Sequence, residues 1–259
     1  MFMSTLSKFN LSTITVGFLS LFSIVSSANA AVMNGNFSNG LDNWTLSGDV
    51  SISDERGLLT TASAVSEDDF PLTGTPFNFS GNDVTAIADL ETFLGVDPFA
   101  LDPTDSFFGA FEGSAIKQTF TANADESLKL NWNFLTNEDS NNTSFANDTA
   151  FVTLVNTDNS SSQVIKLADL SSSLSASANG LGFANETGMK SFSQALTPGE
   201  YVLGLTVIDD KDNTVSSALL LNSVETVEND PNTTTPEPAT IFALLTTFVL
   251  SSKVKRNRR

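Results

Sequence analysis

Acidic side chains gather in two stretches that could bind a cation. Six of them are candidate metal ligands: Asp209, Asp210 and Asp212 in one run, and Glu138, Asp139 and Asp148 around the other. Calcium binds clustered carboxylate oxygens, but the first run lacks the glycine and distal glutamate of an EF-hand loop and contains Lys211. We therefore expect a solvated hairpin tip at residues 209–213, a second solvated loop at 138–148, and no cofactor. Calcium is the alternative left open.

Two tryptophans could stack on sugar rings. Sugar binding needs exposed aromatic platforms with polar partners beside them. Trp132 lies on the apolar face of an alternating segment, and Trp44 follows a turn, where core packing is common. These positions favour the core for both side chains. A carbohydrate-binding module for extracellular polysaccharide, with Trp44 and Trp132 as ligand-binding residues, is the second functional hypothesis.

Missing residue types exclude whole classes of catalysis. The chain of 259 residues contains no cysteine and no histidine, which excludes disulfide frameworks, thiol catalysis, Ser-His-Asp triads and nearly all zinc sites. Glycoside hydrolysis needs only two carboxylates in a cleft, but among 30 acidic residues such pairs arise by chance. We expect no catalytic residues, with a polysaccharide hydrolase as the weakest alternative. A formal charge of −18 disfavours nucleic-acid binding.

The N-terminal 30 residues have the pattern of a secretory signal. Lys8 is the single charge, an apolar run follows from Leu11 to Val25, and Ala28 and Ala30 form the small-x-small pattern of a cleavage site. Residues 1–30 are therefore predicted to be a signal peptide cleaved after Ala30. The expected partners are the Sec translocon and signal peptidase, and the alternative is an N-terminal membrane anchor.

The C-terminal 24 residues combine three features. Pro236, Glu237 and Pro238 precede an uncharged apolar run, Ala239–Leu250, and a basic end follows it: Lys253, Lys255, Arg256, Arg258 and Arg259. The segment 239–252 has 14 residues, about 21 Å as a helix, whereas the hydrocarbon core is about 30 Å thick. This hydrophobic helix is short for a permanent span, and the basic end should stay on the cytoplasmic side.

This tail resembles the PEP-CTERM sorting signal of exported proteins in diderm bacteria. The resemblance implies that residues 236–259 are recognised by an exosortase, so that Pro236, Glu237, Pro238, Arg256, Arg258 and Arg259 carry the sorting signal. It also implies that the membrane helix is transient and that the body ends at the cell surface or outside the cell. A plain C-terminal tail anchor is the alternative.

The segment between the two signals is predicted to be a β-sandwich, residues 31–224, followed by a flexible polar linker, residues 225–235. At Ser127–Phe134, Leu128, Leu130 and Trp132 share one face while lysine and asparagine occupy the other, as in a half-buried strand. The remaining strand candidates are 43–46, 50–52, 114–121, 150–155, 163–167, 201–208 and 218–224. Tyr201, Leu203, Leu205 and Val207 are expected to face inward.

One helix is predicted from residue 83. Val84, Ile87, Leu90 and Leu94 recur at helical spacing, with Asp83 as the expected N-cap and Gly95 at the end.

The start of the body, Asn34-Gly35-Asn36-Phe37 and then Gly40 to Trp44, resembles the opening of galactose-binding-like jelly rolls. That resemblance implies a jelly-roll-like sandwich. Ser38 and Asn222 stand where the acids of the usual structural calcium site of such domains would be, which argues against that site here. A jelly roll does not by itself imply an activity.

Without its two ends the body, residues 31–235, has 29 acidic and six basic side chains, a net charge of −23. Because it contains no cysteine, its stability outside the cell must come from a packed core. These features together predict an exported, non-catalytic protein of the cell surface or extracellular matrix.

Overall fold

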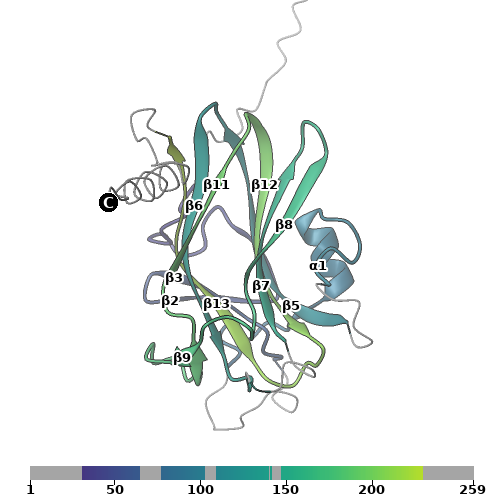
Figure 1. The fold of residues 1–259 in the computed structure, drawn as a ribbon, viewed down its shortest axis with the longest axis vertical. Coiled ribbons are helices and arrows are strands. Elements are labelled where there is room, and N and C mark those ends of the chain that lie inside the picture. The colour runs from purple at the N-terminus through teal and green to yellow at the C-terminus, as the bar shows by residue number, and fades with distance from the viewer. Residues whose placement is uncertain (1–30, 65–76, 103–108, 140, 142–146, 230–259) are drawn as a thin grey trace, which may run out of the picture.

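The protein is described by a computed structural model that covers residues 31–64, 77–102, 109–139, 141 and 147–229. Two antiparallel sheets pack against each other, so the body is an all-β sandwich (Figure 1). The predicted signal peptide, the Pro-Glu-Pro segment, the apolar run and the basic end lie outside the described residues. No helix within the described ranges is long and apolar enough to cross a bilayer.

The first sheet, as described, has the strand order β1–β5–β12–β7–β8, with β4 paired to β5. The bounds are β1 Thr45–Ser47, β4 Thr85–Ala86, β5 Ala110–Ala122, β7 Thr149–Asn156, β8 Ser161–Ala168 and β12 Gly199–Asp210. β12 is the central strand, paired with β5 on one side and with β7 on the other. Its last apolar residue, Ile208, is opposite Thr149, the first residue of β7.

The second sheet has the order β2–β3–β13–β6–β10–β9, with β11 also paired to β6. The bounds are β2 Asp49–Ser53, β3 Arg56–Thr60, β6 Glu126–Thr136, β9 Ser175–Ala176, β10 Asn185–Glu186, β11 Lys190–Ala195 and β13 Ser217–Glu228. β13 begins opposite the end of β6, where Ser217 pairs with Thr136.

The largest apolar cluster lies between the sheets and follows the predicted alternation. β6 contributes Leu128, Leu130, Trp132 and Phe134, and β12 contributes Tyr201, Leu203, Leu205 and Val207. These sets confirm the predicted inward faces, because side chains two residues apart on a strand point the same way.

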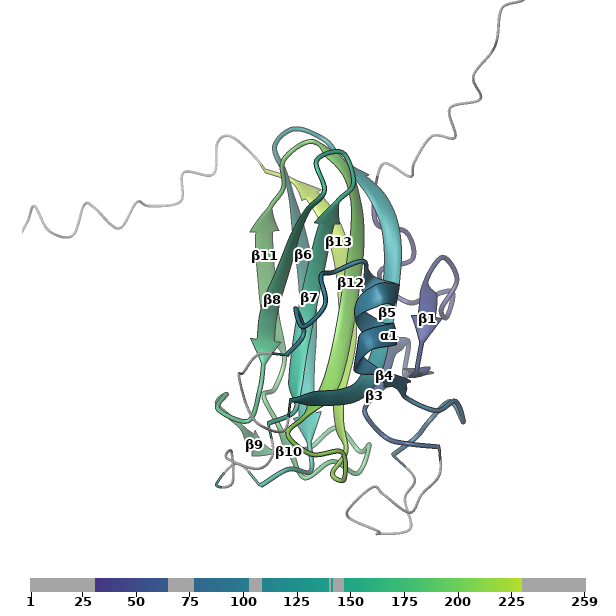
Figure 2. The same cartoon turned by 90° about the vertical axis from the view of Figure 1, so that its right-hand side faces the viewer.

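Helix α1, Ile87–Leu94, covers the outer face of the first sheet beside β5 and β12 (Figure 2). Leu90 and Leu94 pack there against Ala115, Phe151 and Ile208. The prediction of the helix and of its end is confirmed, since Gly95 adopts the left-handed conformation, φ 74°, that ends many helices.

The predicted N-cap of α1 is wrong. Ala86 occupies that position and makes no side-chain cap hydrogen bond. The carboxylate of Asp83 instead accepts hydrogen bonds from the Ser63 hydroxyl (3.0 Å) and the Ala64 amide (3.1 Å). Asp83 therefore ties the segment before the helix to the chain that follows β3.

Two predicted boundaries also need correction. β12 continues through Asp209 and Asp210, which are buried, so these residues do not form a solvated hairpin tip. β13 continues to Glu228 and so includes the first four residues assigned to the linker. The extra pairs have a physical reason, because Glu225 lies opposite Lys129, and opposite charges that face each other across two strands stabilise the pairing.

Candidate functional site

One end of the sandwich interior is polar. Five inward-facing polar residues, on a strand or directly next to one, lie just beyond the apolar core: Thr61 after β3, Thr136 on β6, Asp148 before β7, Asp209 on β12 and Ser217 on β13. Each lies two residues from an inward-facing apolar side chain, and side chains at that spacing share a face. The pairings of Ile208 with Thr149 and of Thr136 with Ser217 bring the five strand ends together from both sheets.

Hydroxyl groups in this layer form a connected set. Ser217 Oγ donates to Thr136 Oγ1 (2.8 Å), and the Ser217 amide donates to Thr61 Oγ1 (3.0 Å). The Glu138 amide donates to the same Thr136 hydroxyl (2.9 Å). The last of these bonds holds the Glu138 backbone at the end of β6, next to the polar layer.

The carboxylates of this layer are buried, and four of their oxygens lack a hydrogen-bond partner. Asp148 is 0 % exposed, Asp209 2 % and Glu138 3 %. Both carboxylate oxygens of Asp148, one of Asp209 and one of Glu138 have no partner at hydrogen-bonding geometry. An unsatisfied buried oxygen is costly, and a buried charge without a counter-charge costs more. We call Glu138, Asp148 and Asp209 the buried acid cluster.

The pKa values of the buried acid cluster also show that its charged carboxylates are unfavourable where they are buried. Burial first, and then the charge of Glu138, raises the pKa of Asp148 well above its usual value. Burial and then Asp148 raise the pKa of Asp209, against which a hydrogen bond from Thr61 acts. Burial, followed by the charges of Asp212 and Asp139, raises the pKa of Glu138 to about 8. All three shifts favour protonated carboxyls.

The other three acidic candidates lie around the cluster rather than in it. Asp210 points to the opposite face of β12, where Asn147 Nδ2 donates to it (3.3 Å). The Asp212 carboxylate accepts from the Thr214 amide in the turn after β12 (3.1 Å). Asp139 is exposed and accepts from the Asn141 amide (2.9 Å). Within the described part of the chain, no group of three or more His, Cys, Asp or Glu side chains is arranged so that it could hold a metal ion.

Both candidate sugar platforms lie in the core between the sheets. Trp44 is 7 % exposed and stacks on Phe37, with ring centroids 5.8 Å apart. Trp132 is 5 % exposed, and its indole nitrogen has no hydrogen-bond partner. Neither ring therefore presents a face to a sugar in solution.

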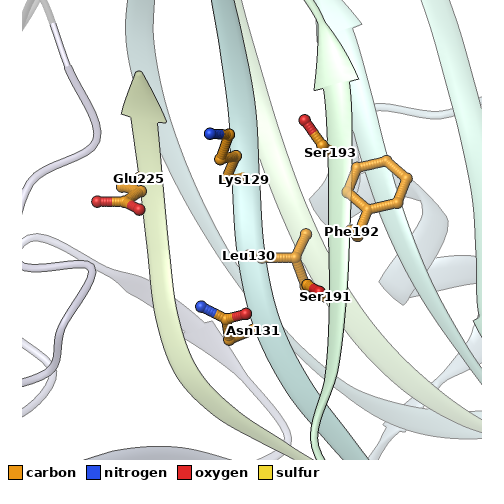
Figure 3. A pocket seen from close by; sticks show the side chains of 7 residues that line it. All are labelled: Lys129, Leu130, Asn131, Ser191, Phe192, Ser193 and Glu225. Carbon is orange, nitrogen blue, oxygen red and sulfur yellow. The ribbon is translucent and has the colours of Figure 1, made fainter. Parts of the chain in front are cut away.

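A shallow groove lies on the outer face of β13, β6 and β11. Its volume is about 270 Å³. The residues that line it are Lys129, Leu130, Asn131, Ser191, Phe192, Ser193 and Glu225 (Figure 3). Strand register aligns Ser193, Lys129 and Glu225 in one row across the three strands. The groove is thus lined by amide, hydroxyl and charged groups, and Phe192, its one aromatic lining residue, packs partly against the core.

Comparisons with known proteins add little to this geometry. No protein family matches the sequence, and no curated protein matches it. Among solved structures, the chain is similar to a carbohydrate-binding module, TmCBM61 in complex with β-1,4-galactotriose. That match has 8 % sequence identity and a TM-score of 0.32, and it covers 78 % of this chain and 100 % of the module. A likeness at this level says nothing about what this chain binds.

The buried acid cluster combines residues from both acidic stretches that the sequence analysis kept apart. Asp209 continues the alternation of Tyr201, Leu203, Leu205 and Val207, so its inward direction could have been inferred from spacing alone. Its contact with Asp148 could not, because it depends on which strands are neighbours.

Proposed function

We propose that this chain is an exported, non-catalytic β-sandwich protein of the cell surface or extracellular matrix, sorted by a PEP-CTERM-like signal at residues 236–259. We also propose that the sandwich belongs to the jelly-roll class. An exosortase would recognise Pro236, Glu237 and Pro238, and the membrane helix would hold the chain only until that step. The body would then be released or attached outside the cell.

The burial of key side chains in the described body supports the proposal that the protein is non-catalytic. Its tryptophans are packed in the core, and the carboxylates of Glu138, Asp148 and Asp209 are closed off from solvent. Glycoside hydrolysis needs an acid and a base on either side of a substrate in an open cleft. The buried acid cluster, with Asp148 at 0 % exposure, cannot reach a polysaccharide.

The export part is tested with a reporter fused after Thr235. A reporter that is active only outside the cytoplasm should give signal in the full chain and lose it when residues 1–30 are deleted. Signal that persists without residues 1–30, or a cytosolic reporter in the full chain, would overturn the proposal.

The sorting part is tested by changing Pro236 and Pro238 together to alanine in the native cells. The variant should accumulate in the membrane fraction, whereas the wild-type body appears at the surface or in the medium. A matched control changes Pro231, in the polar stretch before the signal, to alanine and should be sorted normally. Equal sorting of all three proteins would remove the exosortase step.

The groove on β13, β6 and β11 keeps carbohydrate binding as a second candidate function. Side-chain amides and hydroxyls, here Asn131, Ser191 and Ser193, are groups that hydrogen-bond to sugar hydroxyls. The groove offers only Phe192 as a ring, so weak binding governed by hydrogen bonds is expected rather than stacking.

A glycan array with the full chain tests this candidate. If the groove binds sugar, Asn131→Ala and Lys129→Ala should each remove the signal, while Asp125→Asn, at the turn between β5 and β6, should leave it intact. Binding that survives both groove changes places the sugar elsewhere, and no binding by the wild type removes the candidate.

A further inference from the structure

We propose that the polar end of the sandwich interior is a calcium site, in which Asp148 and Asp209 bind the ion between the two sheets and Glu138 closes it. The site would be structural: it would join β7 and β12 of the first sheet to β6 and β13 of the second. It is distinct from the proposed sorting signal and from the outer groove.

The unsatisfied oxygens carry this proposal. Both oxygens of Asp148 lack a partner at hydrogen-bonding geometry, and Asp148 is completely buried. The Ser217 hydroxyl and the Asp209 carboxyl lie next to Asp148 and favour its charged form, but the Ser217 hydroxyl donates its one hydrogen to Thr136 (2.8 Å). A buried carboxylate without donors needs either a bound proton or a cation. Asp209 and Glu138 lie beside Asp148, each with one oxygen that has no hydrogen-bond partner.

The chemistry of the available ligands selects calcium. Carboxylates and hydroxyls supply oxygen alone, which suits calcium or magnesium rather than zinc or copper. Calcium accepts six to eight oxygens in irregular arrangements, whereas magnesium demands a near-ideal octahedron. The hydroxyl oxygens of Thr61 and Ser217 in the same layer extend the ligand set beyond the carboxylates.

Among the described residues, no three acidic side chains are placed so that they could hold an ion as they stand, so calcium binding would require these carboxylates to move. Without an ion, three neighbouring carboxylates separate or take up protons, because like charges at short range raise each other's energy. Calcium would displace those protons and draw Asp148 and Asp209 together. Binding should therefore release protons, which a direct competition between Ca²⁺ and H⁺ requires.

Calcium titration of the full chain, stripped with chelator at pH 7, tests the site. Calorimetry should show one ion bound at or below about 1 mM, the weak end of extracellular calcium modules. A pH electrode in weak buffer should record proton release. The melting temperature should rise by roughly 5–10 °C at a hundredfold excess over the dissociation constant. Magnesium at the same concentration should do much less.

Replacing the acids by their amides distinguishes a calcium site from a group of buried acids that binds no ion, because only a calcium site loses affinity for the ion. Asp148→Asn and Asp209→Asn should lower calcium affinity by at least about tenfold, yet melt at or above the wild-type temperature in chelator, because each removes a buried acid. Glu138→Gln, at the edge of the site, should weaken binding in the same direction and provides a readout if the inner variants do not fold.

Asp125→Asn is the matched control, because it removes an exposed acid at the turn between β5 and β6, where asparagine tolerates the positive φ of 62°. It should bind calcium like the wild type. No heat, no proton release and no rise in melting temperature up to about 10 mM calcium, tenfold above the expected range, would overturn the proposal. So would binding that Asp148→Asn, Asp209→Asn and Glu138→Gln leave unchanged.

Discussion

At the scale of single residues, Asp49 shows how one buried carboxylate holds a loop against the sandwich. It lies at the start of β2, is 0 % exposed, and accepts a hydrogen bond from the Thr60 hydroxyl. It also accepts from the amides of Phe79 (3.1 Å) and Ser80 (2.7 Å), in the segment before α1. All its partners are donors, so the carboxylate is satisfied without a cation, in contrast to Asp148.

Asp49→Asn should therefore destabilise the protein by about 1–3 kcal/mol, the usual cost of leaving a buried donor unpaired. Either orientation of the amide turns its NH₂ group toward at least one backbone N–H. Urea unfolding measures the loss. Asp54→Asn is the control: Asp54 is exposed and forms an ion pair with Arg56 at 3.2 Å, and such surface pairs contribute about 0–1 kcal/mol. Equal effects of the two changes would refute this role for Asp49.

The buried acid cluster predicts an unusual pH dependence for the calcium-free protein. Glu138 has its pKa raised to about 8 from 4.5, so the folded protein keeps a proton that the unfolded chain has already lost. Stability from this group is complete below about pH 4.5 and falls as the pH rises toward 8. Asp148 and Asp209, with raised pKa values, act in the same direction, and the neighbouring acids Asp212, Asp139 and Glu112 strengthen it.

Urea unfolding in chelator between pH 5 and pH 8 checks this prediction. Stability should fall with rising pH, with a slope of up to about 1.4 kcal/mol per pH unit for each proton held only by the folded state. Glu138→Gln should flatten the profile, and Asp125→Asn should not. Asp169 and Glu186, whose pKa values are lowered by hydrogen bonds against the effect of burial, act only at more acidic pH. A profile that rises from pH 5 to 8 would contradict the account.

At the scale of elements, α1 lies on the first sheet because β12 has a glycine beneath it. A Cβ at Gly204 would lie 2.3 Å from Leu94 Cδ2 and 2.3 Å from Thr153 Oγ1. Both approaches are closer than van der Waals contact allows. The helix and the neighbouring strand therefore share the space that a side chain at this position would occupy.

Gly204→Ala should cost about 1–3 kcal/mol, as overpacking usually does. In a double-mutant cycle, adding Leu94→Ala should recover part of that loss, because the smaller side chain removes one of the two clashes. Thermal or urea unfolding of the four proteins measures the coupling. Strict additivity would mean that α1 is not in contact with Gly204.

The same scale shows what the sequence could and could not predict. Strands with clean alternation, such as β6 and β12, were predicted with their inward faces. In a strand with one buried face, apolar residues recur at every second position, and the sequence shows this directly. β3 was missed because Arg56–Thr60 is short and contains a glycine, and β11 because Phe192 is its single large apolar residue. Both strands owe their pairing to neighbours, β13 and β6, rather than to their own pattern.

The residues of the candidate site, but not their burial, could likewise be predicted from the sequence. Residue types identified Glu138, Asp148 and Asp209 as carboxylates that could bind an ion, but local pattern placed them in solvated loops. Their burial results from long-range register, since β12 and β7 lie side by side in one sheet and β6 and β13 in the other. No window of a single sequence contains that information.

At the scale of the whole molecule, acidic and basic side chains lie on opposite sides of the proposed C-terminal processing site. The body carries 29 acidic and six basic side chains, whereas five basic side chains follow the apolar run at the C-terminus. An excess of one charge sign keeps a released protein soluble, and a basic end beside an apolar helix stays on the cytoplasmic side of a membrane. The proposed cleavage would separate these two parts of opposite character.

The intact mass of the mature protein, purified from its own cells, tests this central claim most directly. Mass spectrometry should find a species well below the 27.5 kDa of the full chain, with Ala31 at its N-terminus and its C-terminus at or near Pro236–Pro238. A mature protein of 27.5 kDa that still ends at Arg259 would contradict export and sorting through the two terminal segments.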